Sequence, residues 1–242
     1  MSSTQVEDAE VLSQQSVAGV WSILRLKAAQ LPTAAQPGTR VQLHDSIGAT
    51  APVMRAKAQT GAIDLLFRTD ESIGESVVSY KAGDCVSISA LTGGRFHSAV
   101  SKTRPVLIGE RLGIAPIIFL AEVLRERQAE SKPLVFMGTR DTFPFRTRPS
   151  TILLPDIPDG VIACMPLLEE WGIPSRLAST EDAPGCFDGS VTELAAIWLR
   201  SLDQSAIEQV ELFASGNREL IRTATELAQE FAVPCQTIEL HA

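Results

Sequence analysis

The hydrophobic pattern changes at Arg104, and this change constrains the fold more than any other feature of the 242-residue chain. Before it, apolar residues alternate with polar ones, as in Ile63, Leu65 and Phe67, which is the period of a half-buried strand. After it, apolar runs alternate with stretches of helical period, which is typical of a parallel sheet covered by helices. The pattern predicts an antiparallel β barrel followed by an α/β domain.

The polar segment 98–103 is the predicted boundary between these two parts. We expect a flexible N-terminus at 1–15, a barrel domain at 16–100 and an α/β domain at 101–242. Apolar runs in the second domain predict strands at 105–109, 134–138, 151–154, 175–178, 209–214 and 235–240. Helical periods predict helices near 116–129, 161–171, 190–201 and 217–231.

The net charge of −8 arises after residue 103, where twelve Lys/Arg face twenty Asp/Glu. Such a surface repels phosphate backbones and anionic lipid, so we expect neither nucleic acid nor membrane as a partner. The longest apolar run, 112–121, is about half of a bilayer span. Residues 1–10 are polar and lack the pattern of a secretory signal, which predicts a cytoplasmic protein.

Four segments resemble the ferredoxin–NADP reductase superfamily, whose members combine a flavin-binding barrel with a nucleotide-binding α/β domain. The stretch 37–43 (PGTRVQL) is similar to the strand entry PGQFVxL. The pair 80–84 (YKAGD) and 90–96 (ALTGGRF) resembles LKPGD and GPLGxxF. The stretches 106–109 (VLIG) and 113–117 (GIAPI) resemble the strand, turn and helix that receive a pyridine nucleotide, and 211–217 (ELFASGN) takes the place of a late strand ending in CGP.

Within that superfamily the chain is most similar to the electron-transfer subunit of dihydroorotate dehydrogenase. The segments 179–182 (STED) and 188–194 (DGSVTEL) resemble its TDDGSxGxxGxVTxLL segment, and 228–236 (AQEFAVPCQ) resembles its last helix and strand. The resemblance covers about residues 16–240.

The resemblance implies FAD between the two domains, held by a strand motif written RxYS or RPxS. The matching stretch here is 55–58 (RAKA), which keeps the cation and lacks the hydroxyl. Arg55 is a candidate ligand of the flavin pyrophosphate or, alternatively, a solvated strand charge, and Lys57 is a weaker candidate beside it. Gly74 and Ser76 are candidates for the turn that meets the flavin phosphates. We therefore expect any FAD to bind more weakly than is usual for the family.

The resemblance also implies a loop for NAD(P)H between 109 and 116. Glycines in such a loop let the backbone approach a pyrophosphate at a helix N-terminus. Gly109 and Gly113 are present, but Glu110 and Arg111 stand between them and add bulk. Glu110 also adds a negative charge, unless Arg111 offsets it by pairing with Glu110 or by reaching the phosphate itself. We expect weak or absent NAD(P)H binding. The alternative is a plain connection between a strand and a helix.

Ser215 and Gly216 stand where the family has Cys and Gly beside the site of hydride transfer. They are candidate cofactor-binding residues by this resemblance. The alternative places Ser215 at a helix N-cap, or next to a cap at Asn217.

The four cysteines form no CxxC pair and are read as free thiols: Cys85, Cys164, Cys186 and Cys235. The orotate-pathway subunit holds a [2Fe–2S] cluster through four thiolates in a loop after its last strand. No cysteine follows Cys235 here, so we expect no iron–sulfur cluster and no metal site.

Two functional hypotheses follow. The first is a flavin-dependent NAD(P)H oxidoreductase or electron-transfer subunit with degenerate cofactor motifs, whose partner is a redox protein or a second copy of the chain. The second is a non-catalytic binding or regulatory relative that keeps the fold without nicotinamide turnover. A flavin-binding protein without nicotinamide turnover lies between them. No catalytic residue is assigned.

Overall fold

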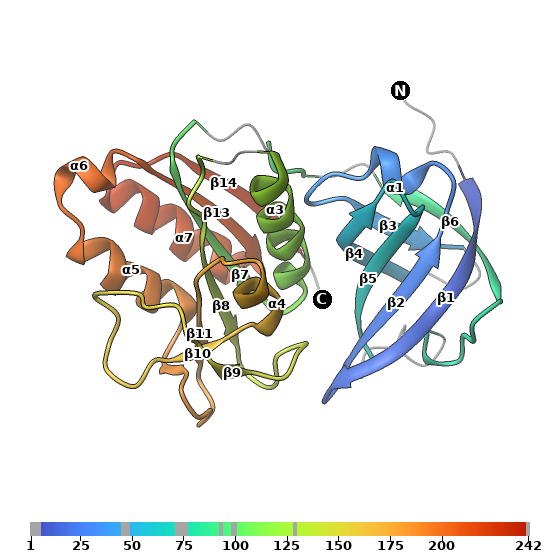
Figure 1. Ribbon diagram of the computed structural model, residues 1–242, viewed down its shortest axis with the longest axis horizontal. Helices are drawn as coiled ribbons and strands as arrows, with labels where there is room; N and C mark the ends of the chain where they lie inside the picture. Colours follow the sequence, from blue (N-terminus) through green and yellow to red (C-terminus); the bar gives the residue numbers. More distant parts are fainter. Residues whose placement is uncertain are drawn as a thin grey trace.

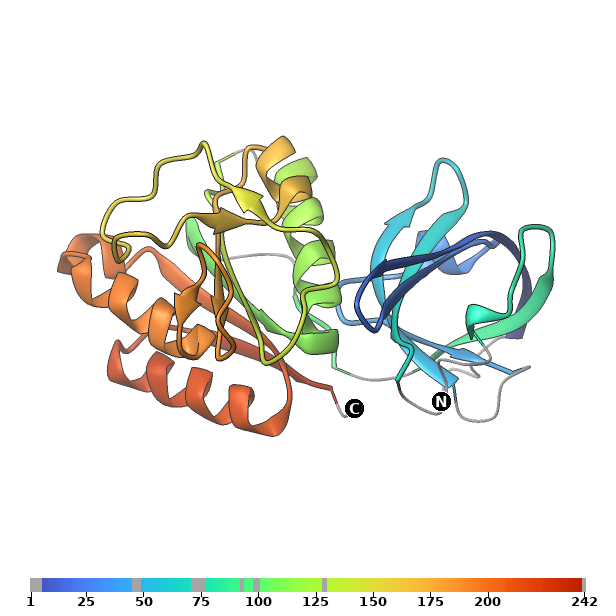
Figure 2. The ribbon, with the colours of Figure 1, turned by 90° about the horizontal axis from the view of Figure 1, so that it is seen from below.

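The computed structural model describes residues 6–44, 49–70, 77–91, 94–97, 101–127 and 130–240. Their secondary structure separates into a barrel, on the right of Figure 1, and an α/β layer structure on the left. Helix α3 lies between the two in both views (Figures 1 and 2). The predicted fold class, an antiparallel barrel followed by a parallel sheet, is confirmed.

Six antiparallel strands close the barrel in the order β1-β2-β5-β4-β3-β6. Closure leaves no strand edge open to another chain. The short helix α1 (Leu31–Ala34) follows β2. The strands are β1 (Val6–Ala18), β2 (Trp21–Lys27), β3 (Arg40–Leu43), β4 (Ala49–Lys57), β5 (Ala62–Arg68) and β6 (Cys85–Leu91).

The expectation of a flexible segment at 1–15 was wrong for the described residues 6–15, which belong to β1. This strand pairs with β2 on one side and β6 on the other. Only Ala9 and Val11 of β1 are fully buried, so the segment is too polar to show a strand pattern by itself. Residues 6–15 form a strand because β1 closes the barrel by pairing with both β2 and β6.

The parallel sheet has the order β12-β11-β8-β7-β13-β14. Helices α3 and α4 pack on the face toward the barrel, whereas α5 and α7 cover the other face. The strands are β7 (Arg104–Glu110), β8 (Leu134–Thr139), β11 (Ser175–Ser179), β12 (Phe187–Asp188), β13 (Val210–Gly216) and β14 (Cys235–Glu239). The helices are η1 (Arg111–Gly113), α3 (Ile114–Arg127), α4 (Pro166–Glu170), α5 (Val191–Ser201), α6 (Gln204–Ile207) and α7 (Arg218–Glu230).

Two predicted elements of the α/β domain were wrong. Residues 151–154 form a loop, because the Glu169 carboxylate accepts hydrogen bonds from the backbone of Thr151 and Ile152 in place of a neighbouring strand. The helix predicted at 161–171 is limited to α4, since β10 (Ala163–Cys164) pairs with β9 (Arg148–Pro149) and Pro166 begins the helix. The predicted boundary near residue 100 lies between β6 and β7 and stays a prediction.

The first two turns of helix α3, up to Ala121, are apolar and buried on all sides, whereas charged residues of its last turns reach the surface. One side packs on the sheet. The other side joins a core that includes Trp21, Met54 and Leu66 of the barrel. None of the helices in the described ranges has the length and apolar character that crossing a membrane requires.

Candidate functional site

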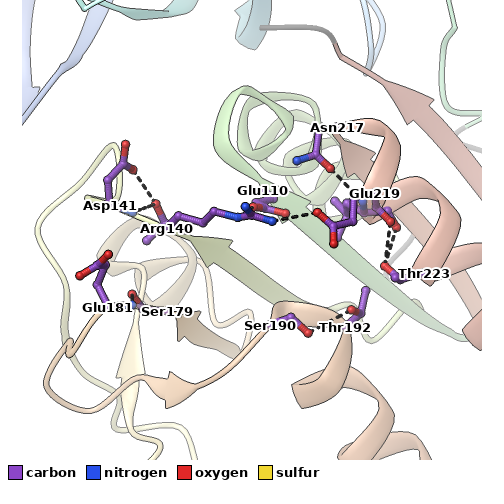
Figure 3. A network of polar contacts seen from close by, with 12 residues as sticks. Glu110, Arg140, Asp141, Ser179, Glu181, Ser190, Thr192, Asn217, Glu219 and Thr223 are labelled. Atoms are coloured by element: carbon purple, nitrogen blue, oxygen red, sulfur yellow. Dashed lines mark hydrogen bonds and ion pairs between the residues drawn. The ribbon is translucent and has the colours of Figure 1, made fainter.

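The order of the sheet places a topological switch point between β7 and β13. The chain leaves β7 toward α3 on one face and leaves β13 toward α7 on the other. In open α/β sheets, ligands bind in the crevice outside the carboxyl ends of the strands at such a point. The candidate site therefore lies around Glu110 and Gly216 (Figure 3).

A cavity of about 110 Å³ opens at this edge, between the N-termini of α5 and α7. Its walls include Glu110, Arg140, Ser190, Thr192 and Glu219. Sites for small organic ligands usually measure about 300–1,000 Å³. This cavity by itself would enclose only a small part of a dinucleotide.

Arg140 connects the two carboxylates of the cavity (Figure 3). Its Nη2 atom lies 2.8 Å from Glu219 Oε2, and its Nε atom lies 3.9 Å from Glu110 Oε1. Burial raises the pKa of Glu110; Arg140 opposes this shift and Glu219 adds to it. A diphosphate at this edge would meet the carboxylates of Glu110 and Glu219, and the nearby Arg140 is already paired with Glu219.

The structure brings four predicted site residues together at the switch point. Gly109 pairs with Ser215 in neighbouring strands. A Cβ atom on Gly113 would lie 2.0 Å from the Ser215 carbonyl oxygen, and one on Gly216 would lie 2.5 Å from a Leu220 methyl group. The glycines thus allow η1 and α7 to pack directly on β13.

The interior of the same loop is strained. Arg111 has a φ of 55°, a left-handed conformation that residues with a side chain seldom adopt. Residues in such regions often mark functional sites. The charge of Arg111 acts on Glu110 and Asp70: it opposes the rise in the pKa of Glu110 that burial causes, and it adds to the lowering of the pKa of Asp70 by Arg68.

Ser215 is fully buried, and its hydroxyl has no hydrogen-bond partner among the described residues. Asn217 supplies the N-cap of α7, because its side-chain oxygen accepts a hydrogen bond from Leu220 N at 2.9 Å. Ser215 is therefore next to the N-cap residue and is not the cap itself. This agrees with the alternative interpretation that placed the cap at Asn217.

Arg55 and Lys57 lie elsewhere, on the side of β4 that faces α3. Arg55 Nη2 is 2.7 Å from Glu122 Oε1, while Lys57 Nζ is 2.9 Å from the same oxygen and 2.8 Å from Glu126 Oε1. The Arg55 guanidinium also stands 5.2 Å from the ring centroid of Trp171. Both cations are held by protein carboxylates, about 12 Å along α3 from its start at the switch point.

Glu122 is the central group of this cluster, with a side chain that is 2% exposed. Burial alone would raise the pKa of Glu122, but hydrogen bonds from Arg55 and Lys57 lower it, so it is an anion at neutral pH. Sequence reasoning missed Glu122 because the residues that bind it are far away in the chain. Arg55, for example, lies 67 positions before it. The other two predicted flavin ligands, Gly74 and Ser76, lie outside the described residues.

Protein side chains occupy part of the junction between the barrel and the carboxyl edge of the sheet, beside a cavity of about 340 Å³ whose walls include Met54, Arg55 and Phe145. Trp21 is fully buried, and its Nε1 donates a hydrogen bond to the Thr142 carbonyl at 2.7 Å. Arg68 stands over the Trp21 ring at 4.9 Å and pairs with Asp70 at 2.7 Å and Asp141 at 2.9 Å. A flavin ring at this point of the junction would have to displace Trp21.

The cysteines are free thiols: Cys85 is exposed, Cys164 is buried, and Cys186 and Cys235 are half-buried. Burial raises the pKa of Cys235 to about 11, and Glu211 adds to this effect. Within the described ranges, His, Cys, Asp and Glu side chains form no group of three or more that could hold a metal ion.

Known structures share this two-domain architecture. The Amycolatopsis cytochrome P450 reductase GcoB is 15% identical, with a TM-score of 0.74 over 98% of this chain and 71% of that chain. The FAD/NAD-binding domain of nitric oxide dioxygenase from Vibrio cholerae is 12% identical, with a TM-score of 0.69 over 96% of this chain and 98% of that one. Phthalate dioxygenase reductase is 15% identical, with a TM-score of 0.63 over 96% and 68%.

At this level of identity the likeness shows a shared fold. No protein-family model and no curated protein matches the chain. The closer resemblance to the dihydroorotate dehydrogenase subunit stays a hypothesis, since these structures do not include that subunit.

Proposed function

We propose that this chain, built on the fold of flavin- and nicotinamide-dependent electron-transfer reductases, is a binding or regulatory protein that does not turn over nicotinamide. The observation that carries the proposal is the indole ring of Trp21 at the junction between the barrel and the carboxyl edge of the sheet. There Trp21 is buried, bonded to Thr142 and covered by Arg68. Hydride transfer between a nicotinamide and a flavin needs both rings in contact at such a junction.

The charges at the carboxyl edge support the same proposal. Glu110 and Glu219 line a cavity of about 110 Å³, and both lie beside Arg140. Helix N-termini attract anions. Here two carboxylates of the protein already lie at these positions: Glu110 ends β7, and Glu219 lies in the first turn of α7. A dinucleotide at this edge would have to overcome the negative charge of Glu110 and Glu219.

The second candidate is the flavin-dependent oxidoreductase, which the likeness to FAD- and NAD-binding reductases favours. In that case FAD lies between the domains with Arg55 at its pyrophosphate, and electrons pass to a redox partner protein. Arg55 would first have to leave Glu122.

Flavin and nucleotide binding by the purified full chain separate the two candidates. The visible spectrum reports bound flavin, and calorimetry with FAD, NADH and NADPH reports affinity. We expect no flavin band, no micromolar binding and no reductase turnover with an artificial acceptor. Stoichiometric flavin together with NAD(P)H-dependent turnover would overturn the proposal and establish the oxidoreductase.

A Trp21→Ala variant tests whether the Trp21 ring keeps FAD out of the junction. Removing the indole ring creates space at the junction, so the variant should bind FAD more tightly than the wild type if Trp21 is the obstacle. Phe136→Ala is a suitable comparison for stability, because Phe136 is equally buried but belongs to the core on the opposite face of the sheet. Equal FAD affinity in the wild type and Trp21→Ala would show that Trp21 is not the obstacle.

A further inference from the structure

The cavity beside Trp21 lies between the two domains, on the outer face of the barrel. It measures about 340 Å³, which is within the range of sites for small organic molecules. Alternate residues of β1 and β2 line its barrel side, and the segment 144–146 and the start of α4 line the other side. It shares no wall residue with the cavity at Glu110 and is therefore a separate site.

The wall of this cavity is mostly apolar. Four half-buried side chains line it and pack against one and the same hydrophobic core: Val17, Ile23, Phe145 and Leu167. Met54 and Met165 belong to that core and also reach the wall, and methionine side chains adapt readily to the shape of a ligand. Partly exposed apolar groups from two domains around one space favour an apolar ligand, since each methylene group that is buried strengthens binding about fourfold.

Guanidinium groups outnumber carboxylates in the same wall, which holds Arg25, Arg55 and Arg146 but only Asp64. Asp64 is already satisfied, because its two oxygens accept hydrogen bonds from Nε and Nη2 of Arg25 at 2.7 and 2.8 Å. The carboxylate that binds Arg55 is Glu122, which is not part of the wall. Only Nε and Nη2 of Arg55 bond to it, so Nη1 is left for another acceptor.

Arg146 is the cation of the wall that has no carboxylate. It is exposed, lines the cavity and makes no ion pair with any residue in the described ranges. The planar fork of a guanidinium matches a carboxylate in shape as well as in charge. The wall therefore offers a place for a carboxylate directly next to its apolar surface.

We propose that this cavity binds a small carboxylic acid with an apolar chain, its carboxylate at Arg55 and Arg146 and its chain against the apolar wall. At about 30 Å³ for a group the size of a water molecule, the cavity has room for about ten such groups, which corresponds to an acid of medium chain length. The proposal rests on the proposed function in one respect: a small acid can enter only where no flavin ring lies at the junction.

Three probes test the proposal by calorimetry with the full chain at neutral pH. Octanoate carries both features, octylammonium has the same chain with the opposite charge, and propionate has the carboxylate with a short chain. We expect octanoate to bind at least tenfold more tightly than either of the others, because one lacks the ion pair and the other lacks five methylene groups. Equal affinities of octanoate and octylammonium, or no binding of octanoate at millimolar concentration, would overturn the proposal.

Two charge-reversed variants locate the carboxylate. Arg146→Glu should weaken octanoate at least tenfold, because it places a negative charge at the proposed head group. Arg148→Glu is the matched control, since Arg148 is also exposed and changes the net charge equally but does not line the cavity. If the two variants weaken octanoate equally, the carboxylate does not bind at Arg146 and the proposal fails.

Addition of FAD to the octanoate complex separates this proposal from the proposed function. We expect FAD to leave octanoate bound. Displacement of octanoate by FAD would make the cavity part of a flavin site and overturn the proposal. Flavin binding with NAD(P)H turnover while octanoate stays bound would overturn the proposed function alone, and a protein that binds neither flavin nor octanoate would overturn this proposal alone.

Discussion

Replacement of Glu122 by Gln tests how the barrel and α3 are held together. The variant keeps the size of the side chain and one acceptor oxygen, but it removes the negative charge between Arg55 and Lys57. Three contacts converge on Oε1: Arg55 Nη2 at 2.7 Å, Arg55 Nε at 3.2 Å and Lys57 Nζ at 2.9 Å.

The expected loss follows from the burial of the three groups. Glu122 is 2% exposed, but Arg55 and Lys57 are 24% and 33% exposed, so water still solvates the cations after the change. Removing one partner of a fully buried ion pair costs about 3–5 kcal/mol, and exposed pairs contribute at most about 1 kcal/mol. We therefore expect Glu122→Gln to lower the free energy of unfolding by about 1.5–3 kcal/mol, measured by urea titration at pH 7.

The lowered pKa of Glu122 also predicts that the stability difference between wild type and Glu122→Gln depends on pH. Because the pKa of Glu122 is lowered on folding from its ordinary value of 4.5, the carboxylate stabilises the fold above that pH, and this stability is lost as the pH falls through the lower folded pKa. The difference between wild type and variant should thus be constant near neutrality and shrink in acid.

Glu126→Gln is the matched control on the same helix. Glu126 is 47% exposed and contacts Lys57 at 2.8 Å, so its replacement should cost less than about 1 kcal/mol. If Glu122→Gln costs no more than Glu126→Gln, or if the difference from wild type grows in acid, the ion cluster is not what joins α3 to the barrel.

Four further outcomes are expected. The Glu110→Gly, Arg111→Gly double variant should bind NADH or NADPH more tightly than wild type by calorimetry, since it removes the charge and bulk of the loop; unchanged weak binding would contradict this cause. Gly113→Ala should lower the free energy of unfolding by about 1–3 kcal/mol, because its Cβ would lie 2.0 Å from a carbonyl oxygen of β13; a variant of wild-type stability in urea would argue against such close packing. Burial raises the pKa of Cys235 to about 11, so at pH 8 iodoacetamide should alkylate the exposed Cys85 first, as mass spectrometry can show; equal rates would refute this. Metal analysis after anaerobic purification should find no iron–sulfur cluster, and stoichiometric iron with acid-labile sulfide would overturn that expectation.

Much of the candidate site was visible in the sequence as separate segments. The loop with Gly109 and Gly113 and the strand end with Ser215 and Gly216 follow strands of strong apolar pattern, so their meeting at the switch point was predictable. Their roles were not. The buried hydroxyl of Ser215 and the positive φ of Arg111 could not be predicted, because both depend on how η1 packs on β13.

The sequence by itself determined the fold class, because side-chain period is a local property: residues two apart share a strand face, and residues three and four apart share a helix face. Only the tertiary structure decided which groups meet. Glu122 reads as a solvated acid on an apolar helix until β4 brings Arg55 to 2.7 Å, and Trp21 reads as an ordinary strand residue until it bonds to Thr142. Such pairings join residues 67 and 121 positions apart, and closing the barrel onto α3 sets them, which no local pattern encodes.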